Sequence, residues 1–192
     1  MLAARVQKPW SEEARLRSLG DPEPIPVIWN LTSDPALMNQ PRLISRDGDV
    51  LLTLDGRSDQ VPALARAFRD TLKRRRLVIT GGPGTGKTTL AVQLLLGLLA
   101  TRAADLATVR KAKTSEVVPV PVLLPLSSWN TTTHPLLQDW LVDRLAPDLG
   151  KRTADALLSG GHILPILDGL DEIADGGPCR HNNRPQRLPR RQ

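Results

Sequence analysis

The chain has 192 residues, a formal net charge of +6 and a single cysteine, Cys179. That length can bury a real core, and one cysteine excludes an internal disulfide framework and argues against a structural zinc site. No run of about 18 uninterrupted apolar residues occurs, and the amino terminus lacks the apolar stretch of a secretory signal. The composition therefore predicts a cytoplasmic protein with no membrane segment.

The positive charge is gathered at the carboxyl end of the chain. Residues 176–192 contain five arginines and no acidic residue, and removing five charges from +6 leaves +1 for the rest. The other basic cluster, residues 73–76, falls where a helix is expected to end, and cations suit a helix C-terminus. The charge distribution therefore does not favour a dedicated nucleic-acid surface.

The amino-terminal part of the chain predicts short elements joined by turns. Residues 1–20 predict a short helix that starts at Ser11, Glu12 and Glu13 and has little to bury. Proline geometry makes residues 21–26 extended, and the apolar residues in 27–31 form a possible strand. We interpret this region as a lead-in that lies along the next domain.

A second group of short elements precedes the basic cluster. Residues 43–54 predict a small hairpin-like element with a turn at its centre, and residues 56–57 follow it directly. Residues 58–72 predict a helix with a polar cap, a proline in its first turn and apolar side chains at helical spacing.

The most informative stretch runs from Gly81 to Thr88 and has the pattern GxxxxGK followed by Thr. Its glycines permit backbone angles closed to other residues, so successive N–H groups can turn inward around a phosphate. Lys87 can reach the β- and γ-phosphates, and the Thr88 hydroxyl can ligate Mg²⁺. An apolar strand predicted over 77–80 and an apolar helix over 90–100 disfavour a chance glycine-rich turn. The predicted nucleotide-binding residues here are Gly81, Gly82, Pro83, Gly84, Thr85, Gly86, Lys87, Thr88 and Thr89.

Strands and helices alternate after the loop helix. The predicted elements are the end of the loop helix and a connection over 101–116, a strand within 117–126, helices over 133–145 and 154–158, and a buried strand over 162–168. Prolines remove ladder donors from the first of these strands, which places its regular part from Val122 onward. The alternation predicts an α/β fold with a parallel sheet.

Acidic residues follow the last predicted strand. Ligands of open parallel sheets sit beyond the carboxyl ends of the strands, so Asp168 should point toward the phosphate loop and hold Mg²⁺, through water, opposite Thr88. Taken alone Asp168 could equally be a helix N-cap, but its pairing with the loop favours the metal role. Glu172 is the first choice as the base that activates water, with Asp171 as a supporting acid.

These motifs resemble those of the NACHT family of signal-transduction NTPases. Residues 166–172, Ile-Leu-Asp-Gly-Leu-Asp-Glu, resemble the family's Walker B signature, and residues 81–89 resemble its phosphate loop. Residues 54–57 resemble the hydrophobic-Gly-Arg lead-in that contacts the adenine side, and residues 122–129 resemble the strand before Walker B. The resemblance covers roughly residues 45–175.

The resemblance implies a P-loop NTPase fold, with a three-layer parallel sheet and helices on both faces. It implies nucleotide contacts from Gly56 and Arg57, with ATP or ADP and Mg²⁺ as cofactors. Related STAND ATPases are held closed by ADP and oligomerise after exchange for ATP, so self-association of the intact domain is implied too.

The identity of the base rests on few residues. No Asn-Lys-x-Asp or Thr-Lys-x-Asp stretch occurs, so ATP is favoured over GTP. Phe68, Trp129 and Trp140 could stack on a base, but their spacing favours core packing. His134 and His162 are expected in a turn and at a strand start, without a metal partner.

The family pattern breaks after Asp175. A complete domain would continue with a helix, a strand ending in a sensor Arg, and helical and winged-helix parts. Residues 176–192 instead have one large aliphatic residue and no periodicity, so we expect a disordered basic tail. Because arginine greatly exceeds lysine, as in GC-rich coding, we hypothesise an out-of-frame tail on a domain incomplete at its C-terminal side.

The sequence therefore predicts a lead-in over 1–44, a nucleotide-binding domain over 45–175 and a tail over 176–192. The leading interpretation is an ATP- and Mg²⁺-binding NACHT-type module whose hydrolysis is weak or absent, since the sensor and arginine-finger segments are missing. The alternative is a non-catalytic remnant or interaction fragment without stable nucleotide binding. A small-molecule kinase ranks third, because no acceptor-binding segment is recognisable.

Overall fold

The computed structural model describes residues 2–18, 27–32, 34, 56–57, 60–72 and 75–173. In chain order the helices are α1 (Leu2–Ser18), α3 (Val61–Asp70), α4 (Lys87–Ala112), α5 (Leu137–Leu149) and α6 (Lys151–Ser159). The strands are β1 (Ile28–Trp29), β2 (Gly56–Arg57), β3 (Val120–Pro125) and β4 (Ile163–Asp168), and the short 3₁₀ turns are η2 (Leu126–Ser128) and η3 (Leu170–Glu172). The predicted hairpin over 43–54, the polar cap at 58–59 and the tail over 176–192 lie outside the described residues.

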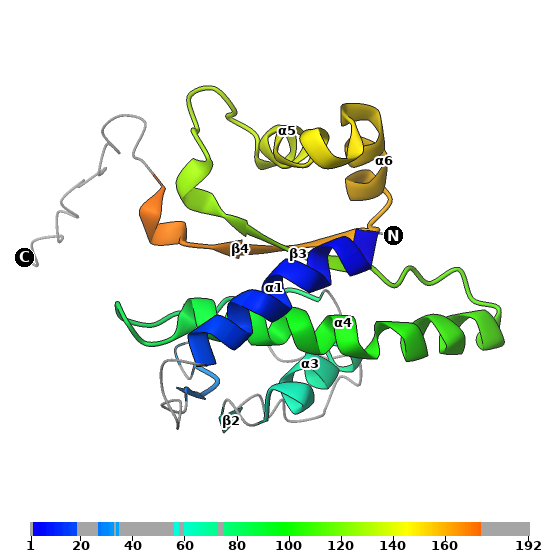
Figure 1. Ribbon diagram of the computed structural model, residues 1–192, viewed down its shortest axis with the longest axis horizontal. Helices are drawn as coiled ribbons and strands as arrows, with labels where there is room; N and C mark the ends of the chain where they lie inside the picture. The colour runs from blue at the N-terminus through cyan, green and yellow to red at the C-terminus, as the bar shows by residue number, and fades with distance from the viewer. Residues whose placement is uncertain are drawn as a thin grey trace, which may run out of the picture.

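A parallel pair of strands lies between two layers of helices (Figure 1). β3 and β4 pair from Val120 opposite Ile163 to Pro125 opposite Asp168. The helices α5 and α6 cover one face, and α4 runs along the other with α3 beyond it. The predicted strand over 162–168 and the alternation of strands with helices are confirmed. The three-layer P-loop sheet is a wider statement and stays a prediction.

The prolines of β3 lie on the edge that faces away from β4. The N–H of Val120 donates to the carbonyl of His162 at 2.8 Å, so even-numbered residues of β3 direct their N–H groups toward β4. Pro121 and Pro125 are odd-numbered, so the N–H groups that they lack would have pointed away from β4. No described strand pairs with β3 on that side. A strand with one free edge tolerates proline there, so the prediction that the regular strand starts at Val122 is wrong.

The prediction of a strand over 77–80 is wrong, because these residues have no ladder partner among the described residues. Leu77 and Ile79 pack into a core cluster, whereas Val78 is 79% exposed. On β4 the even-numbered N–H groups face β3, so Pro165 removes a donor from the opposite edge. The loss of that donor weakens pairing of a further strand on the outer edge of β4.

α4 continues beyond its apolar part over 90–100, because residues 101–112 are mostly helix formers, and it runs to Ala112, where Lys113 in the left-handed conformation ends it. This end lies within residues 101–116, where the sequence predicted it. By length and composition alone α4 could cross a membrane, but it packs against α1, α3 and β3 as a core helix does.

The apolar residues of α4 form two neighbouring stripes. Ala91, Leu95 and Leu99, spaced four apart, lie in the cluster of β3, β4 and α5. Leu90 and Leu94 lie in the second cluster, built on α3. Packing on two sides explains why the helix is apolar nearly all round.

α1 begins at Leu2 rather than at Ser11, and it buries more than predicted. Leu2, Val6 and Trp10, spaced four apart, pack against the cluster that contains β3 and α4. Arg5 adds an exposed ion pair to Asp148 at the end of α5, at 3.4 Å. The apolar stripe lies in the half of the segment that sequence reasoning left out of the helix.

The helices before and after β3 follow the predictions with shifted bounds. α3 carries Pro62 in its first turn, and α5 and α6 cover the two helices predicted between the strands. His134 lies in the turn before α5, where its Nε2 contacts Asp143 at 2.9 Å. Hydrogen bonds from His134 and from Lys151 of α6 lower the pKa of Asp143. This carboxylate therefore joins the turn, α5 and α6.

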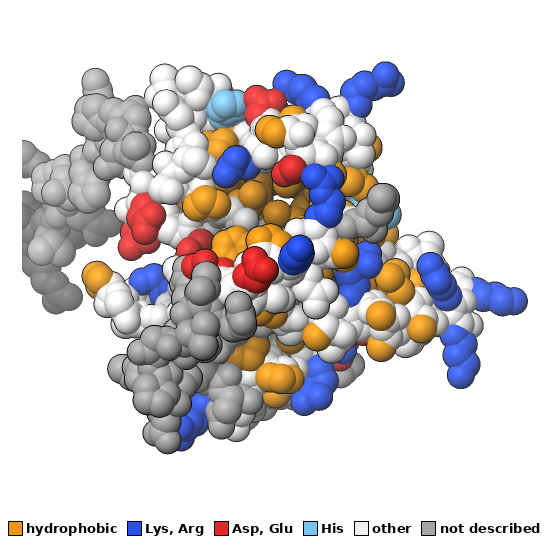
Figure 2. Space-filling model, viewed as in Figure 1, with side chains coloured by type: hydrophobic (Ala, Val, Ile, Leu, Met, Phe, Trp, Pro, Cys, Tyr) orange, Lys and Arg blue, Asp and Glu red, His pale blue; other side chains and the backbone are white. Residues whose placement is uncertain are grey.

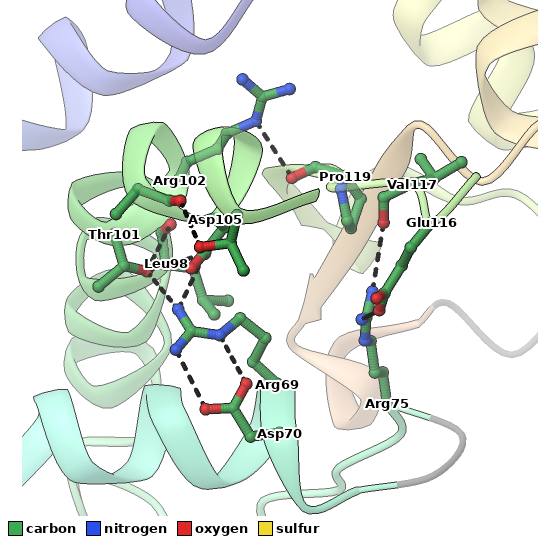
Figure 3. A network of polar contacts seen from close by, with 12 residues as sticks. Arg69, Asp70, Arg75, Leu98, Thr101, Arg102, Asp105, Glu116, Val117 and Pro119 are labelled. Carbon is green, nitrogen blue, oxygen red and sulfur yellow. Dashed lines mark hydrogen bonds and ion pairs between the residues drawn. The ribbon is translucent and has the colours of Figure 1, made fainter. Parts of the chain in front are cut away.

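Arg69 fastens α3 to α4 (Figure 3). Its Nη1 donates to Oδ2 of Asp105 and to Oγ1 of Thr101, both at 2.8 Å, and its Nε donates to Oδ1 of Asp70 at 2.9 Å. The hydrogen bond to Asp70 and the charge of Asp105 raise the pKa of Arg69 despite its burial. The guanidinium thus stays charged at the α3–α4 contact.

Two further arginines hold the backbone that leads into β3. Arg75 contacts the carboxylate of Glu116 and donates to the carbonyl of Val117 at 3.4 Å. Arg102 donates to the carbonyls of Val118 and Pro119 at 3.2 and 3.4 Å (Figure 3). The basic residue at 75 is therefore part of a structural network.

We expect Asp105→Asn to lower the free energy of unfolding by about 1–3 kcal/mol, because it removes the less exposed of the two carboxylates that pair with the Arg69 guanidinium. Asp70→Asn is the matched control, since the same arginine binds it but its side chain is 60% exposed against 20% for Asp105. For Asp70→Asn we expect less than about 1 kcal/mol. Urea unfolding measures both, and equal losses would contradict this account.

Candidate functional site

The phosphate-loop sequence forms a tight turn directly before α4. Gly84 and Gly86 have φ of 72° and 84°, which favour glycine, and Oγ1 of Thr85 donates to the carbonyl of Gly82 at 2.9 Å. No side chain caps the first turn of α4. The uncapped N–H groups of that turn can therefore serve an anion.

Lys87 folds back over the loop. Its Nζ donates to the carbonyls of Gly81 and Gly82 at 2.8 and 2.9 Å. No acidic side chain in the described part of the chain forms a salt bridge with this ammonium group. Its acceptors are neutral, so a phosphate oxygen would be a stronger partner for the charge.

Thr88 and Asp168 meet although they lie 80 residues apart in the sequence. Oγ1 of Thr88, in the first turn of α4, donates to Oδ2 of Asp168, the last residue of β4, at 2.8 Å. Both side chains are partly buried. The structure thus brings together the two residues that the sequence suggested as Mg²⁺ ligands.

Asp171 and Glu172 lie on η3, just beyond Asp168, and both are exposed. Acidic side chains are visible on the surface at the end of the molecule where β4 leads into η3 (Figure 2). Gly169 has φ of 77°, and Cδ of Glu172 lies 3.0 Å from the position that a Cβ on Gly169 would occupy. Glu172 therefore folds over Gly169, and no described contact joins either acid to Thr88 or Lys87.

Val27 of the lead-in lies against the phosphate loop, directly before β1, which pairs with β2. These strands pair antiparallel, with Trp29 opposite Gly56. A Cβ on Gly56 would lie 2.8 Å from Cζ2 of Trp29, and one on Gly86 would lie 2.5 Å from Cγ2 of Val27. Sequence reasoning named Gly56 and Arg57 but missed Val27 and Trp29, whose only signal was an apolar run within a polar lead-in.

The aromatic residues considered for base stacking lie elsewhere. Phe68 and Trp140 are buried in the two core clusters. Trp129 packs on Trp140, with ring centroids 6.0 Å apart, and its Nε1 donates to the carbonyl of His134 at 2.9 Å. The prediction of core packing for these three side chains is confirmed.

A cavity of about 290 Å³ lies near the other end of α4. Its apolar wall includes Phe68, Leu98 and Val109, and its charged wall includes Arg69 and Arg75. Both arginines are paired within the network of Figure 3. The cavity is therefore separate from the phosphate loop, and its arginine charges are already satisfied.

No family model, curated protein or solved structure matches this chain. The resemblance to the NACHT family therefore rests on the motifs of the chain and on their geometry.

We expect Gly86→Ala to destabilise the protein more than Gly84→Ala. Both positions have positive φ, so each substitution costs about 1–2 kcal/mol of backbone strain. Only the Cβ at position 86 would also collide with Val27, since nothing lies within 4 Å at position 84. Thermal unfolding of the two variants measures the difference.

Adding Val27→Ala should recover part of the loss in Gly86→Ala and none in Gly84→Ala. Equal destabilisation by the two glycine substitutions, with no recovery, would show that Val27 does not press on the loop.

Proposed function

We propose that the chain binds a magnesium adenine nucleotide as a NACHT-type P-loop module of the cytoplasm, with weak or absent hydrolysis. The observation that carries this proposal is the 2.8 Å contact between Thr88 and Asp168. It joins the last residue of the GxxxxGKT motif to the acid that ends the parallel strand β4, which is only partly buried.

The donor set at this contact fits Mg²⁺. A hydroxyl and a carboxylate are hard oxygen ligands, and Mg²⁺ in phosphate sites is typically held by one or two such groups together with water and substrate phosphates. Thr88 would bind the ion directly, and Asp168 would hold it through water. The bound ion would neutralise charge on the phosphates.

The loop residues supply the rest of the phosphate site. The N–H groups of residues 82 and 84–88 would cradle the phosphates, and the absence of a side chain at Gly84, where nothing lies within 4 Å of a Cβ position, leaves room for their close approach. Lys87 would exchange its two carbonyl acceptors for phosphate oxygens. These carbonyls keep the ammonium at the mouth of the loop until a ligand arrives.

We propose weak or absent hydrolysis partly because the side chain of the candidate base, Glu172, is not placed to activate a water. Glu172 lies over Gly169 and would have to rotate to orient a water, with Asp171 as its neighbour. Self-association of the STAND kind belongs to the same proposal and rests on the family resemblance.

One observation favours the alternative of a fragment without stable nucleotide binding. Residues 77–80 lead directly into the phosphate loop but make no backbone pairing with the described residues. A loop whose preceding segment is not held in a sheet is less well ordered for binding. Nucleotide titration separates the two functions.

Mg·ATP and Mg·ADP should raise the thermal unfolding midpoint of the protein by several degrees. A ligand at about 100 times its dissociation constant adds about 2.7 kcal/mol to the free energy of unfolding. The shift should vanish in Lys87→Ala and in Asp168→Ala, each compared with its own ligand-free form. Lys111→Ala, at the opposite end of α4, is the matched control and should keep the shift.

No shift in the wild-type chain would favour the fragment without nucleotide binding. A shift that survives in Lys87→Ala would place the nucleotide outside the phosphate loop.

ATP turnover should be slow, below about 1 s⁻¹, the lower end of the range for related phosphoryl-transfer enzymes. Where turnover is measurable, Glu172→Gln should lower kcat about 100-fold or more with little change in nucleotide affinity. Asp171→Asn is the control, and an equal loss in that variant would contradict the assignment of Glu172 as the base.

A further inference from the structure

We propose that the indole N–H of Trp29 recognises the adenine base of the bound nucleotide by donating to an unprotonated ring nitrogen. The inference rests on the proposed function, because it needs a nucleotide in the phosphate loop. It assigns a recognition role to a residue of the lead-in, upstream of every motif that resembles a nucleotide-binding family.

The first observation is a missing partner. Nε1 of Trp29 is buried and makes no hydrogen bond to any described residue. A buried tryptophan N–H usually finds an acceptor, as Nε1 of Trp129 does on the carbonyl of His134. An unmet donor in a rigid aromatic side chain indicates an acceptor that belongs to a ligand.

The second observation is the position of this donor. Trp29 is two residues from Val27, whose side chain touches Gly86 of the phosphate loop. Two residues of extended chain span about 7 Å. A nucleotide with its phosphates in the loop is longer than this span, so its base can reach the surroundings of Trp29.

The side chains around Nε1 of Trp29 suit a flat apolar ring that carries a hydrogen-bond acceptor in its plane. Trp29 and Leu31 are half-buried and belong to the apolar cluster built on α3. The N–H of an indole can only donate, so it selects a base nitrogen that carries no hydrogen. Adenine offers three such nitrogens in its rings, N1, N3 and N7, whereas guanine offers two, N3 and N7, because its N1 carries a hydrogen.

Gly56 acquires a different role in this arrangement. Cζ2 and Cε2 of Trp29 lie 2.8 and 3.0 Å from the position of a Cβ on Gly56, so any larger residue would displace the indole ring. Gly56 is therefore a positioning residue for Trp29, and its effect on nucleotide binding runs through that ring.

The test compares Mg·ATP with Mg·tripolyphosphate, which carries the phosphates but no base, by calorimetric titration of the full chain. Trp29→Phe keeps an aromatic ring and removes the N–H. It should lower the affinity for Mg·ATP about 5–10-fold and leave the affinity for Mg·tripolyphosphate unchanged. Trp129→Phe removes an N–H that already has a partner, and it should leave the ratio of the two affinities unchanged.

A second measurement needs no substitution. The 1-deaza, 3-deaza and 7-deaza analogues of ATP each replace one ring nitrogen with CH, and one of them should bind the wild-type chain about 5–10-fold more weakly than ATP. The same analogue should bind Trp29→Phe as ATP does. That analogue identifies the nitrogen that accepts from Trp29.

Several results would overturn the inference. Equal affinity of wild type and Trp29→Phe for Mg·ATP, or full affinity of all three deaza analogues, would remove the base contact and leave phosphate binding intact. If Trp29→Phe lowered the affinity for Mg·tripolyphosphate as much as that for Mg·ATP, the residue would act on the loop through Val27. If neither ligand binds the wild-type chain, the proposed function fails together with the inference.

Discussion

The hydrogen bond between Thr88 and Asp168 is the constraint on which the rest of the structure depends. It fixes the first turn of α4 against the carboxyl end of β4, and thereby fixes the phosphate loop relative to the parallel strands. The register of β3 on β4 ends at the same residue, since Pro125 pairs with Asp168. The phosphate loop, α4 and the β3–β4 pair therefore meet at this one contact, which joins the two residues proposed to hold Mg²⁺.

α4 extends this constraint through the molecule. At one end it holds Lys87 and Thr88 of the loop, and along its length two apolar stripes join the clusters built on β3 and on α3. Farther along α4, Asp105 accepts a hydrogen bond from Arg69 of α3. Arg102 donates to the backbone carbonyl of Val118, just before β3. A single helix thus positions the loop, the α3 layer and the start of β3.

The sequence was sufficient for the parts of the site that local residue chemistry encodes. The glycines of the loop, the apolar strand ending in Asp168 and the helix after the loop follow from identity and spacing alone. The lack of a described ladder partner for residues 77–80 could not be predicted, because it depends on the edge of β4 that carries the distant Pro165. The start of β3 was predicted too late in the sequence, because a proline disrupts a strand only where its missing N–H would have faced a neighbouring strand. Which edge of β3 has a neighbour cannot be read from the sequence.

The burial of α1 and the position of Trp29 were beyond sequence reasoning for a related reason. Leu2, Val6 and Trp10 form a stripe whose partner surface, from β3 and α4, exists only in the folded chain. Trp29 lies in a polar lead-in with no motif, and its unmet N–H becomes visible only when the neighbours of its ring are known. Contacts distant in sequence determine both features.

The prolines on the free edge of β3 bear on how copies of this chain can associate. A sheet grows from one molecule to the next when an exposed strand offers a regular row of N–H and C=O groups to its neighbour. Pro121 and Pro125 interrupt that row, while the side toward β4 is fully paired. Protein that accumulates to high concentration is thereby protected from fibril growth at this edge of β3.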